Sequence, residues 1–310
     1  MKKPLDLTEI LTSFTGLTSS DVIRTINLYK NKYKKFYKPK KSGGLRAIYH
    51  PAQPLKMLQY ALELNVLRHL PVSEIAMAYR KDLKSPLRKI ADAHAGYAYT
   101  VRTDFKDFFP SLRPSDLLPL ITAHYTVKED DLKLIAQILF WGARTLPIGA
   151  PSSPTVSNII MEKFDKKILE LSGAIDKNGT VSRYADDIFF STNKKGASYI
   201  FFDELCTFCQ NCDHPRLQIN REKVLFLSRG TKRVVCGITI ASQGWPSIGR
   251  LRKTEVKQLL YQMKNRVLPE EKYHYLRGLM AFIKDVEPDL FNRLVIKYGY
   301  TNEMLISPIL

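Results

Sequence analysis

The chain has 310 residues, of which 45% are hydrophobic and 25% are charged, as in a globular protein with two domains or one lobed domain. Its net charge of +18 favours nucleic acid over a membrane as partner, because the apolar runs are too short or too interrupted to span a bilayer. The amino terminus also lacks an apolar signal core. We therefore expect a cytoplasmic protein with no membrane partner.

The four cysteines are too few and too clustered to form a disulfide framework. Three of them, Cys206, Cys209 and Cys212, precede His214 at spacings that resemble a metal-ligand set. They also fall in a predicted helix, where thiols three residues apart pack against neighbouring side chains. We favour packing and leave metal binding as the alternative.

The amino-terminal third is predicted to hold two helices and a basic hairpin. A capping cluster at 19–21 starts the first helix, and apolar residues at helical spacing over 55–70 form a core helix. Between them, lysines alternate with aromatics over 29–44 before the strand-like segment 45–50. This pattern predicts a hairpin whose tip contacts phosphates and bases, or one whose lysines only protect an edge strand.

The segment 97–104 alternates bulky and smaller residues with period two, which predicts a strand with Asp104 at its end. Pro110 prevents the simple continuation of this strand. Acids at strand ends are ordinary turn residues, and they are also common in active sites. Asp104 alone therefore leaves both interpretations open.

A loop rich in proline and glycine, residues 146–154, precedes a predicted helix. Ser153 can cap this helix and Pro154 suits its first position, while an apolar stripe continues to Leu171. Gly149 would let a ligand approach the backbone, and the helix start offers N–H groups to anions.

Asp186 and Asp187 lie between two β-prone segments, which predicts a hairpin with both acids at or beside its tip. An isolated Asp-Asp pair is more often a solvated turn. Further along we expect a helix at 199–212 and strands at 217–227 and 234–240.

Gly244 and Pro246 suggest a linker, after which the hydrophobic period becomes helical. We expect a basic helical lobe over 247–310, which either binds nucleic acid or is simply well solvated. Its basic side chains include Arg250, Arg252, Lys253, Lys257, Lys264, Arg266, Arg277 and Lys284.

Four of these segments together, in order and spacing, resemble the reverse transcriptases, and specifically the bacterial retron type. They are Thr103 to Ser111, Leu146 to Pro154, Tyr184-Ala185-Asp186-Asp187, and Leu217-x-Ile219-Asn220-x-x-Lys223. The resemblance covers nearly the whole chain. It implies an α+β right-hand polymerase fold: fingers over 1–95 with part of 119–150, a palm with an antiparallel sheet over 96–243, and a helical thumb over 244–310.

The resemblance also implies roles for the acids and for one lysine. Asp104 and Asp186 would bridge two Mg²⁺ ions, with the Phe105 carbonyl assisting and Asp187 supporting. Two such ions activate the primer hydroxyl and neutralise charge on the phosphoryl group. Lys223 would protonate the departing pyrophosphate, or would only neutralise its charge.

Substrate contacts follow from the same resemblance. Arg46 would grip the triphosphate of the incoming dNTP, and Phe109 would clash with a ribose 2′-hydroxyl and so select deoxyribose. The other nucleotide-binding positions would be Phe108, Ile148 and Gly149.

The chain departs from two retron motifs. The usual Asn-Ala-x-x-His appears as Ile90 to His94, and the usual Val-Thr-Gly as Val235-Cys236-Gly237; Ile148 also replaces a usual glutamine. RNA contacts are expected at His94, Cys236, Gly237, Arg250, Arg252, Lys253 and Arg277.

The expected activity is RNA-directed DNA polymerisation. It would copy a structured non-coding RNA into branched multicopy single-stranded DNA, primed from a guanosine 2′-hydroxyl, in anti-phage defence with a separate effector protein. The alternatives are an untemplated polymerase of the abortive-infection type and a non-catalytic RNA-binding scaffold. Retention of all three acids favours an enzyme, and a product that follows an RNA template excludes the untemplated type.

Overall fold

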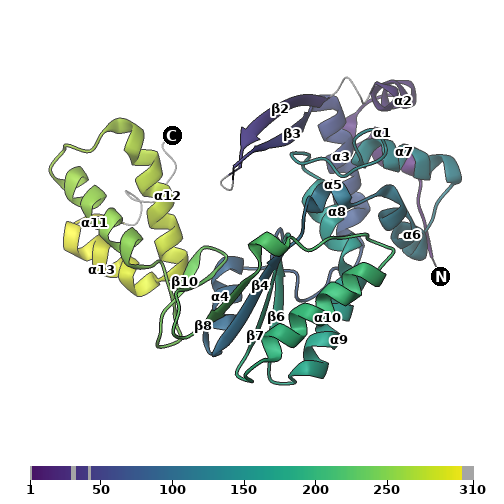
Figure 1. Cartoon of the computed structure of the whole chain (residues 1–310). Coiled ribbons are helices and arrows are strands. Elements are labelled where there is room, and N and C mark those ends of the chain that lie inside the picture. The colour runs from purple at the N-terminus through teal and green to yellow at the C-terminus, as the bar shows by residue number, and fades with distance from the viewer. Residues whose placement is uncertain (1, 29–32, 41–42, 302–310) are drawn as a thin grey trace.

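The computed structural model describes residues 2–28, 33–40 and 43–301. Amino-terminal helices with a β-hairpin occupy one end of the molecule, a four-stranded sheet with its helices lies in the middle, and a helical lobe forms the other end (Figure 1). The fold is therefore α+β, as predicted. No helix among the described residues is long and apolar enough to cross a membrane.

The amino-terminal part begins with a helix that the sequence reading missed. Helix α1 (Leu7–Thr15) starts where the Asp6 side chain accepts a hydrogen bond from the Glu9 backbone N–H, and it ends at Gly16 with φ 70°. The helix that was expected to start at 19–21 is α2 (Ser19–Asn27), and Thr18 caps it. The expected core helix is α3 (Gln53–Asn65).

The predicted hairpin is confirmed. Strand β2 (Tyr33–Pro39) pairs antiparallel with β3 (Leu45–Pro51) along its whole length. Residues 29–32 and 41–42, which include part of the expected basic tip, lie outside the described residues. The loop before helix α8 (Ser153–Ile160) lies against this hairpin, because the Tyr49 backbone N–H donates to the Ile148 carbonyl over 2.7 Å.

The central helices are short, and one expected helix is divided. The apolar stripe predicted from Ser153 continues through two helices, α8 (Ser153–Ile160) and α9 (Glu162–Ile175), which break at Met161. The Ser153 hydroxyl donates to the Pro147 carbonyl instead of capping the helix.

The remaining helices of the amino-terminal and central parts are α4 (Pro86–Ala95), α5 (Phe108–Ser111), α6 (Pro114–His124), α7 (Glu129–Leu139), α10 (Ala197–Asn211), and the 3₁₀ turns η2 (Leu67–His69) and η3 (Arg221–Lys223). Strands β1 (Lys3–Pro4) and β5 (Tyr125–Thr126) form a small parallel pair.

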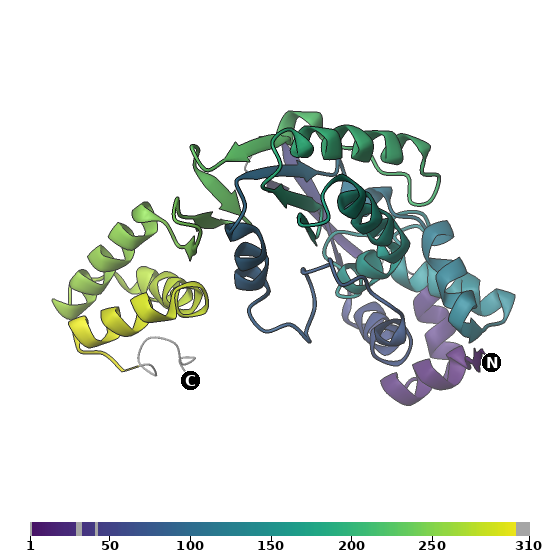
Figure 2. The same ribbon diagram turned by 90° about the horizontal axis from the view of Figure 1, so that it is seen from below.

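The central sheet is antiparallel with strand order β6-β7-β4-β8. Its strands are β4 (Tyr99–Asp104), β6 (Thr180–Tyr184), β7 (Asp187–Thr192) and β8 (Leu225–Ser228). Helices α9 and α10 cover one face, where the Phe190 ring stacks on Phe201. Helix α4 lies on the other face, where His94 contacts Phe189 (Figure 2).

Two expectations about residues 234–246 were wrong. Instead of one strand, β9 (Arg233–Val235) and β10 (Ile238–Ile240) form a tight hairpin. Its two turn residues, Cys236 and Gly237, both have positive φ, 47° and 79°, as a two-residue hairpin turn requires. Pro246 is not in a linker, because β11 (Pro246–Ser247) pairs with β10.

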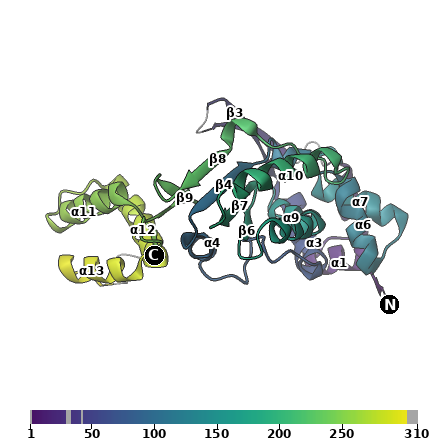
Figure 3. The same cartoon turned by 60° about the horizontal axis from the view of Figure 1, so that its bottom comes forward.

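The carboxy-terminal lobe consists of α11 (Arg250–Lys264), α12 (Glu270–Val286) and α13 (Pro288–Tyr298) (Figure 3). Its core is continuous with the face of the sheet that α4 covers, since Ile90 and Phe189 belong to the same buried cluster as Leu260 and Met280. Glu287 ties the lobe to β11, because its carboxylate accepts from the Ile248 backbone N–H over 2.6 Å.

Candidate active site

Strand register places two of the predicted acids on one face of the sheet. Asp104, the last residue of β4, lies directly opposite Asp187, the first residue of β7. Residues alternate between faces, so Arg102 shares this face, and so does Ser191, which contacts His94 of α4. The acids therefore lie on the face opposite α9 and α10, at the end of the sheet. Like charges directly across a strand pair repel, so this arrangement requires cations nearby.

The Asp104 carboxylate is buried and is held by a cation. Lys223 Nζ lies 3.1 Å from Oδ1 and 3.2 Å from Oδ2, so the ammonium bridges both oxygens. Asn220 fixes the strand end, because its backbone N–H donates to the Asp104 carbonyl over 2.7 Å. The segment 217–223 thus brings Lys223 to Asp104, which joins two predicted site residues.

The Asp187 carboxylate is held by Arg102. The guanidinium donates from Nε to Oδ1 and from a terminal nitrogen to Oδ2, both over 3.0 Å, a bidentate fork. Desolvation raises the pKa of Asp187 to about 6, against the opposing pull of Arg102. Arg102 therefore compensates the charge of Asp187, which would otherwise lie against the charge of Asp104.

Asp186 lies in the turn between β6 and β7, after Ala185, whose φ is 57°. Its carbonyl accepts the Phe105 backbone N–H over 3.2 Å, which joins the turn to the end of β4. Desolvation, followed by repulsion from Asp104, raises the pKa of Asp186, and Lys223 and Arg46 partly oppose this rise. A carboxylate with a raised pKa beside another carboxylate is typical of sites that bind cations or carry out chemistry.

The donor set fits a divalent cation at Asp104 and Asp186. Both groups offer the oxygen ligands that Mg²⁺ prefers, and the Lys223 ammonium already occupies a cation position on Asp104. Among the described residues, however, no three His, Cys, Asp or Glu side chains are grouped to hold a metal. The Asp187 carboxylate is instead engaged in its ion pair with Arg102.

Tyr79 lies near two residues for which the sequence predicts nucleotide contacts, Arg46 of β3 and Phe109 of α5. The Tyr79 ring meets the Phe109 ring edge-on at 6.4 Å between centroids. Desolvation, together with the charge of Asp186, raises the pKa of Tyr79, which Arg183 and Arg46 oppose. The structure therefore brings Tyr79 close to Phe109, Arg46 and Asp186, and the nucleotide-binding roles of Arg46 and Phe109 stay predictions.

Three of the expected nucleotide-binding residues make contacts within the protein. Phe108 is only 3% exposed and stacks on Phe105, so its ring is unavailable to a nucleotide. A Cβ on Gly149 would lie 2.9 Å from the Ile48 side chain, so this glycine, with φ 112°, permits the close approach of β3, while the residue itself is exposed. Ile148 takes part in the same contact through its carbonyl.

Several of the expected RNA contacts are engaged inside the protein. His94 is fully buried, its Nδ1 lies 2.8 Å from the Ser191 hydroxyl, and desolvation lowers its pKa to about 3, so direct contact with RNA is excluded. Arg252 donates to the Gly237 carbonyl over 2.6 Å, and Lys253 pairs with Glu287 at 2.7 Å. Of the other expected RNA-binding residues, Cys236 is partly buried, Arg277 is half-buried and Arg250 is exposed.

The cysteine cluster is part of helix α10 and its end. Cys206 and Cys209 are buried, and desolvation raises the pKa of the Cys209 thiol to about 12. His214 contacts Asp116 and not the cysteines: its Nδ1 lies 3.0 Å from Oδ1 of Asp116. Thiols with raised pKa values are poor metal ligands, which supports the packing interpretation.

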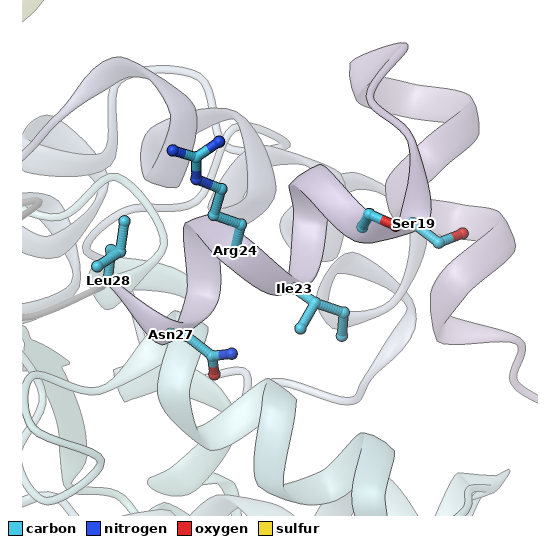
Figure 4. Close-up of a pocket in the computed structure, with 6 residues that line it drawn as sticks. Ser19, Ile23, Arg24, Asn27 and Leu28 are labelled. Atoms are coloured by element: carbon cyan, nitrogen blue, oxygen red, sulfur yellow. The ribbon is translucent and has the colours of Figure 1, made fainter.

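A cavity of about 790 Å³ lies on helix α2, far along the chain from the acids (Figure 4). It is lined by Ser19, Ser20, Ile23, Arg24, Asn27 and Leu28, all from one helix and its end. Among the residues that the structure describes, no polar groups from other elements line it, so it lacks the features of an active site.

Sequence reasoning missed a buried network behind the turn that contains Asp186. The Arg183 guanidinium forms two 2.7 Å bonds to Asp165 and one of 3.0 Å to the Ala185 carbonyl. It also donates to Asn158, whose amide donates to the Ala78 carbonyl next to Tyr79. The position of Arg183 just before the acidic turn is the one sequence signal for this role. The position of Arg102 beside the acids could have been predicted from the strand alternation, since residues two apart in a strand share a face and Arg102 precedes Asp104 by two residues.

Comparison with known proteins agrees with this geometry. The family model described as reverse transcriptase (RNA-dependent DNA polymerase) matches residues 38–276. The chain is 35% identical to the retron Ec73 reverse transcriptase of Escherichia coli and 32% identical to the retron Ec83 reverse transcriptase of the same species; each alignment covers 86% of this chain, and 86% and 87% of those proteins, respectively.

Among solved structures, the apo telomerase of Candida tropicalis is similar with a TM-score of 0.49 at 12% identity, over 89% of this chain and 58% of that one. The match of the family model and the identity to the Escherichia coli proteins establish the family. The chain belongs to the reverse transcriptases, the RNA-directed DNA polymerases, and within them to the retron type.

Proposed function

We propose that this RNA-directed DNA polymerase copies part of a structured non-coding RNA into branched multicopy single-stranded DNA, with Asp104 and Asp186 as the metal-binding acids. The observation that carries the site assignment is the desolvated Asp186 beside Asp104, with Lys223 as a cation on the latter. The retron relatives support the RNA and its product as partners. By the same resemblance, priming uses a guanosine 2′-hydroxyl, and the system serves anti-phage defence with a separate effector protein.

The metal assignment is two Mg²⁺ ions, which when bound activate the primer hydroxyl and neutralise the phosphoryl charge. Asp104 and Asp186 would hold them, with the Phe105 carbonyl assisting; the Phe105 backbone N–H donates to the Asp186 carbonyl, which keeps this residue beside the turn. Asp187 supports the site indirectly, since its charge is committed to Arg102.

Lys223 is the proton donor that this geometry offers. Its ammonium lies on Asp104, and its side chain is 44% exposed, so it can reach a phosphate oxygen without leaving the site. Arg46 supplies a second cation from β3, opposite the acids, for the triphosphate of the incoming dNTP.

The three parts of the fold take the roles of a right hand in this proposal. Residues 1–95 with part of 119–150 form the fingers, 96–243 the palm, and 244–310 the thumb. The exposed Arg250 of α11 is a candidate phosphate contact. Arg252 instead joins the thumb to the palm through the Gly237 carbonyl, and Lys253 forms an ion pair with Glu287 inside the thumb.

Phe109→Ala is expected to raise ribonucleotide incorporation relative to deoxyribonucleotide. The Phe109 ring is half-buried against Tyr79 and faces the nucleotide side of the site, so its removal frees space for a 2′-hydroxyl. Primer extension with paired dNTP and NTP substrates measures the selectivity. Phe105→Leu, which changes a buried core aromatic, is the matched control for core packing. Unchanged selectivity in Phe109→Ala would exclude it as the gate.

The function is tested by expressing the chain with its native locus and sequencing the small DNA that it makes. A branched DNA that follows a neighbouring transcript, and that is absent in Asp186→Asn, is the expected result. Asp213→Asn, an exposed aspartate paired with Arg216, is the matched control and should leave the DNA unchanged. DNA with no template in the locus would instead support the untemplated polymerase, and normal DNA from Asp186→Asn would refute the metal assignment.

A further inference from the structure

A second cavity, of about 560 Å³, lies beside the active site between the end of α3, helix α8 and the loop that contains Tyr79. Its volume falls within the range of pockets that enclose organic ligands of nucleotide size. Unlike the cavity on α2, it is lined by charged and polar groups from several elements, among them Glu63, Arg68, Tyr79, Lys81, Thr155 and Asn158. Convergent polar groups of this kind indicate a binding site.

Glu63 is the deeply buried charge of this cavity, with 9% of its side chain exposed. Both of its contacts involve the same oxygen: the Thr155 hydroxyl donates to Oε1 over 3.4 Å, and Lys81 Nζ lies 3.7 Å from it. The other oxygen accepts no hydrogen bond from any residue that the structure describes. Lys81 is 79% exposed, so this long pair is screened by water and compensates the buried charge weakly. A buried carboxylate in this state favours a ligand that donates hydrogen bonds.

A carboxylate only accepts, and it binds best where two parallel donors meet its two oxygens. Among the nucleobases, guanine presents two adjacent donors on its pairing edge, N1–H and the 2-amino group. Adenine and cytosine each offer one amino group beside an acceptor, and uracil offers one N–H between two acceptors. The chemistry of Glu63 therefore selects guanine.

The rim of the cavity suits the rest of a nucleotide. Tyr79 is 46% exposed and offers a ring on which a base can stack. Arg68 and Lys81 are exposed cations suited to a phosphate backbone. An unpaired base of a single strand, held by stacking and by its pairing edge, is the usual object of sequence recognition in RNA.

The cavity is rigidly connected to the catalytic turn. Asn158, which lines it, accepts from Arg183 over 3.2 Å and donates to the Ala78 carbonyl over 2.8 Å. Arg183 in turn holds the Ala185 carbonyl, one residue before Asp186. Tyr79 lines the cavity, and its ring also meets Phe109 of α5, the short helix that follows Asp104 in the chain. A nucleotide bound in the cavity therefore lies next to the position where the RNA is copied.

We propose that this cavity receives the base of an unpaired guanosine of the RNA strand, with Glu63 accepting from N1–H and the 2-amino group. The proposal rests on the copying of RNA described above. It deepens that function by giving the enzyme one base-specific contact with its RNA, close to the catalytic acids.

The test measures fluorescence anisotropy at one fixed salt concentration, with a labelled RNA–DNA duplex that carries a single-stranded RNA 5′ overhang. Each overhang position is in turn guanosine, inosine, which lacks the 2-amino group, or adenosine. At one position, wild-type protein should bind guanosine about tenfold more tightly than adenosine, with inosine between them. Glu63→Gln, which exchanges an acceptor for a donor at equal size, should lose this preference.

Glu74→Gln is the matched control, because Glu74 is an exposed acid of the same loop and does not line the cavity. Both variants lose one negative charge, so a general gain in RNA binding appears in both, whereas loss of base preference appears only in Glu63→Gln. Wild-type protein without a base preference, or a preference that Glu63→Gln retains, would overturn the proposal. Guanosine monophosphate that competes at the same concentration as the RNA would place a free nucleotide in the cavity, and would overturn the RNA assignment.

A measurement on wild-type protein covers the case in which Glu63→Gln does not fold. An overhang with 6-thioguanosine at the preferred position is irradiated, and the crosslinked peptide is identified by mass spectrometry. Attachment within residues 63–82 or 155–158 supports the proposal, and attachment elsewhere contradicts it. Primer extension on the same duplex, run in parallel, separates a failure of the cavity assignment from a failure of RNA copying itself.

Discussion

Asp186→Asn is expected to reduce the rate of nucleotide addition by about a thousandfold while leaving the protein as stable as the wild type, or more stable. The loss follows from removing a charge that stabilises the transition state, which typically costs two to three orders of magnitude. The gain in stability follows from the raised pKa of Asp186, whose causes are desolvation and then repulsion from Asp104. A neutral amide of the same shape removes both costs.

The sign of this stability effect depends on pH. A carboxyl whose pKa is raised on folding stabilises the fold while it is protonated, and this contribution is lost as the pH rises through the folded pKa. The melting temperature of Asp186→Asn should therefore exceed that of the wild type near pH 8. The difference should shrink as the pH falls toward the ordinary aspartate value of 3.8. Single-turnover primer extension and calorimetry at several pH values measure the two effects.

The neighbouring acid provides a comparison. Desolvation raises the pKa of Asp187 to about 6 in spite of the bidentate contact with Arg102, so Asp187→Asn should also raise the melting temperature near pH 8. Part of this gain should be offset, because the change leaves the 34% exposed Arg102 guanidinium without its charged partner. Equal destabilisation by both would show that Asp186 is held by favourable contacts and would contradict the electrostatic description of the turn.

The catalytic geometry illustrates what sequence periodicity can and cannot supply. The alternation of bulky and smaller residues correctly predicted that Asp104 ends a strand, and the β-prone flanks correctly predicted a hairpin at Asp186 and Asp187. Both features depend on local sequence. The pairing of Asp187 with Arg102 depends on the register between β4 and β7, which joins positions 85 residues apart. No local pattern contains that register.

Backbone conformation explains two further differences. Cys236 was expected within a strand, because Val234 to Ile240 is uniformly β-prone, yet it adopts φ 47° in a turn that sequence rules assign mainly to Asn, Asp and Gly. Tyr79 has φ 63°, which is costly for a bulky residue and is tolerated where the surroundings fix it. The Asn158 contact with Ala78 supplies that constraint, and it lies 80 residues away in the chain.

Arg183→Met is expected to lower the free energy of unfolding by about 3–5 kcal/mol, the usual result of removing one partner from a buried ion pair. Arg183 and Asp165 are both fully buried, and Met would leave the Asp165 carboxylate and the Ala185 carbonyl without their donors. Urea unfolding followed by circular dichroism measures the change. Asp165→Asn should also destabilise the protein, since it leaves the guanidinium unpaired.

The double change Arg183→Met with Asp165→Leu separates the structural role of this pair from its role in positioning the catalytic turn. Replacing both charges by apolar groups of similar size should recover most of the lost stability, because no buried charge then remains unpaired. It does not restore the donors to Ala185 and Asn158, so the turn and the loop of Tyr79 lose their common anchor. We therefore expect a folded protein whose nucleotide-addition rate stays well below that of the wild type, and a double variant with full activity would show that Arg183 serves stability alone.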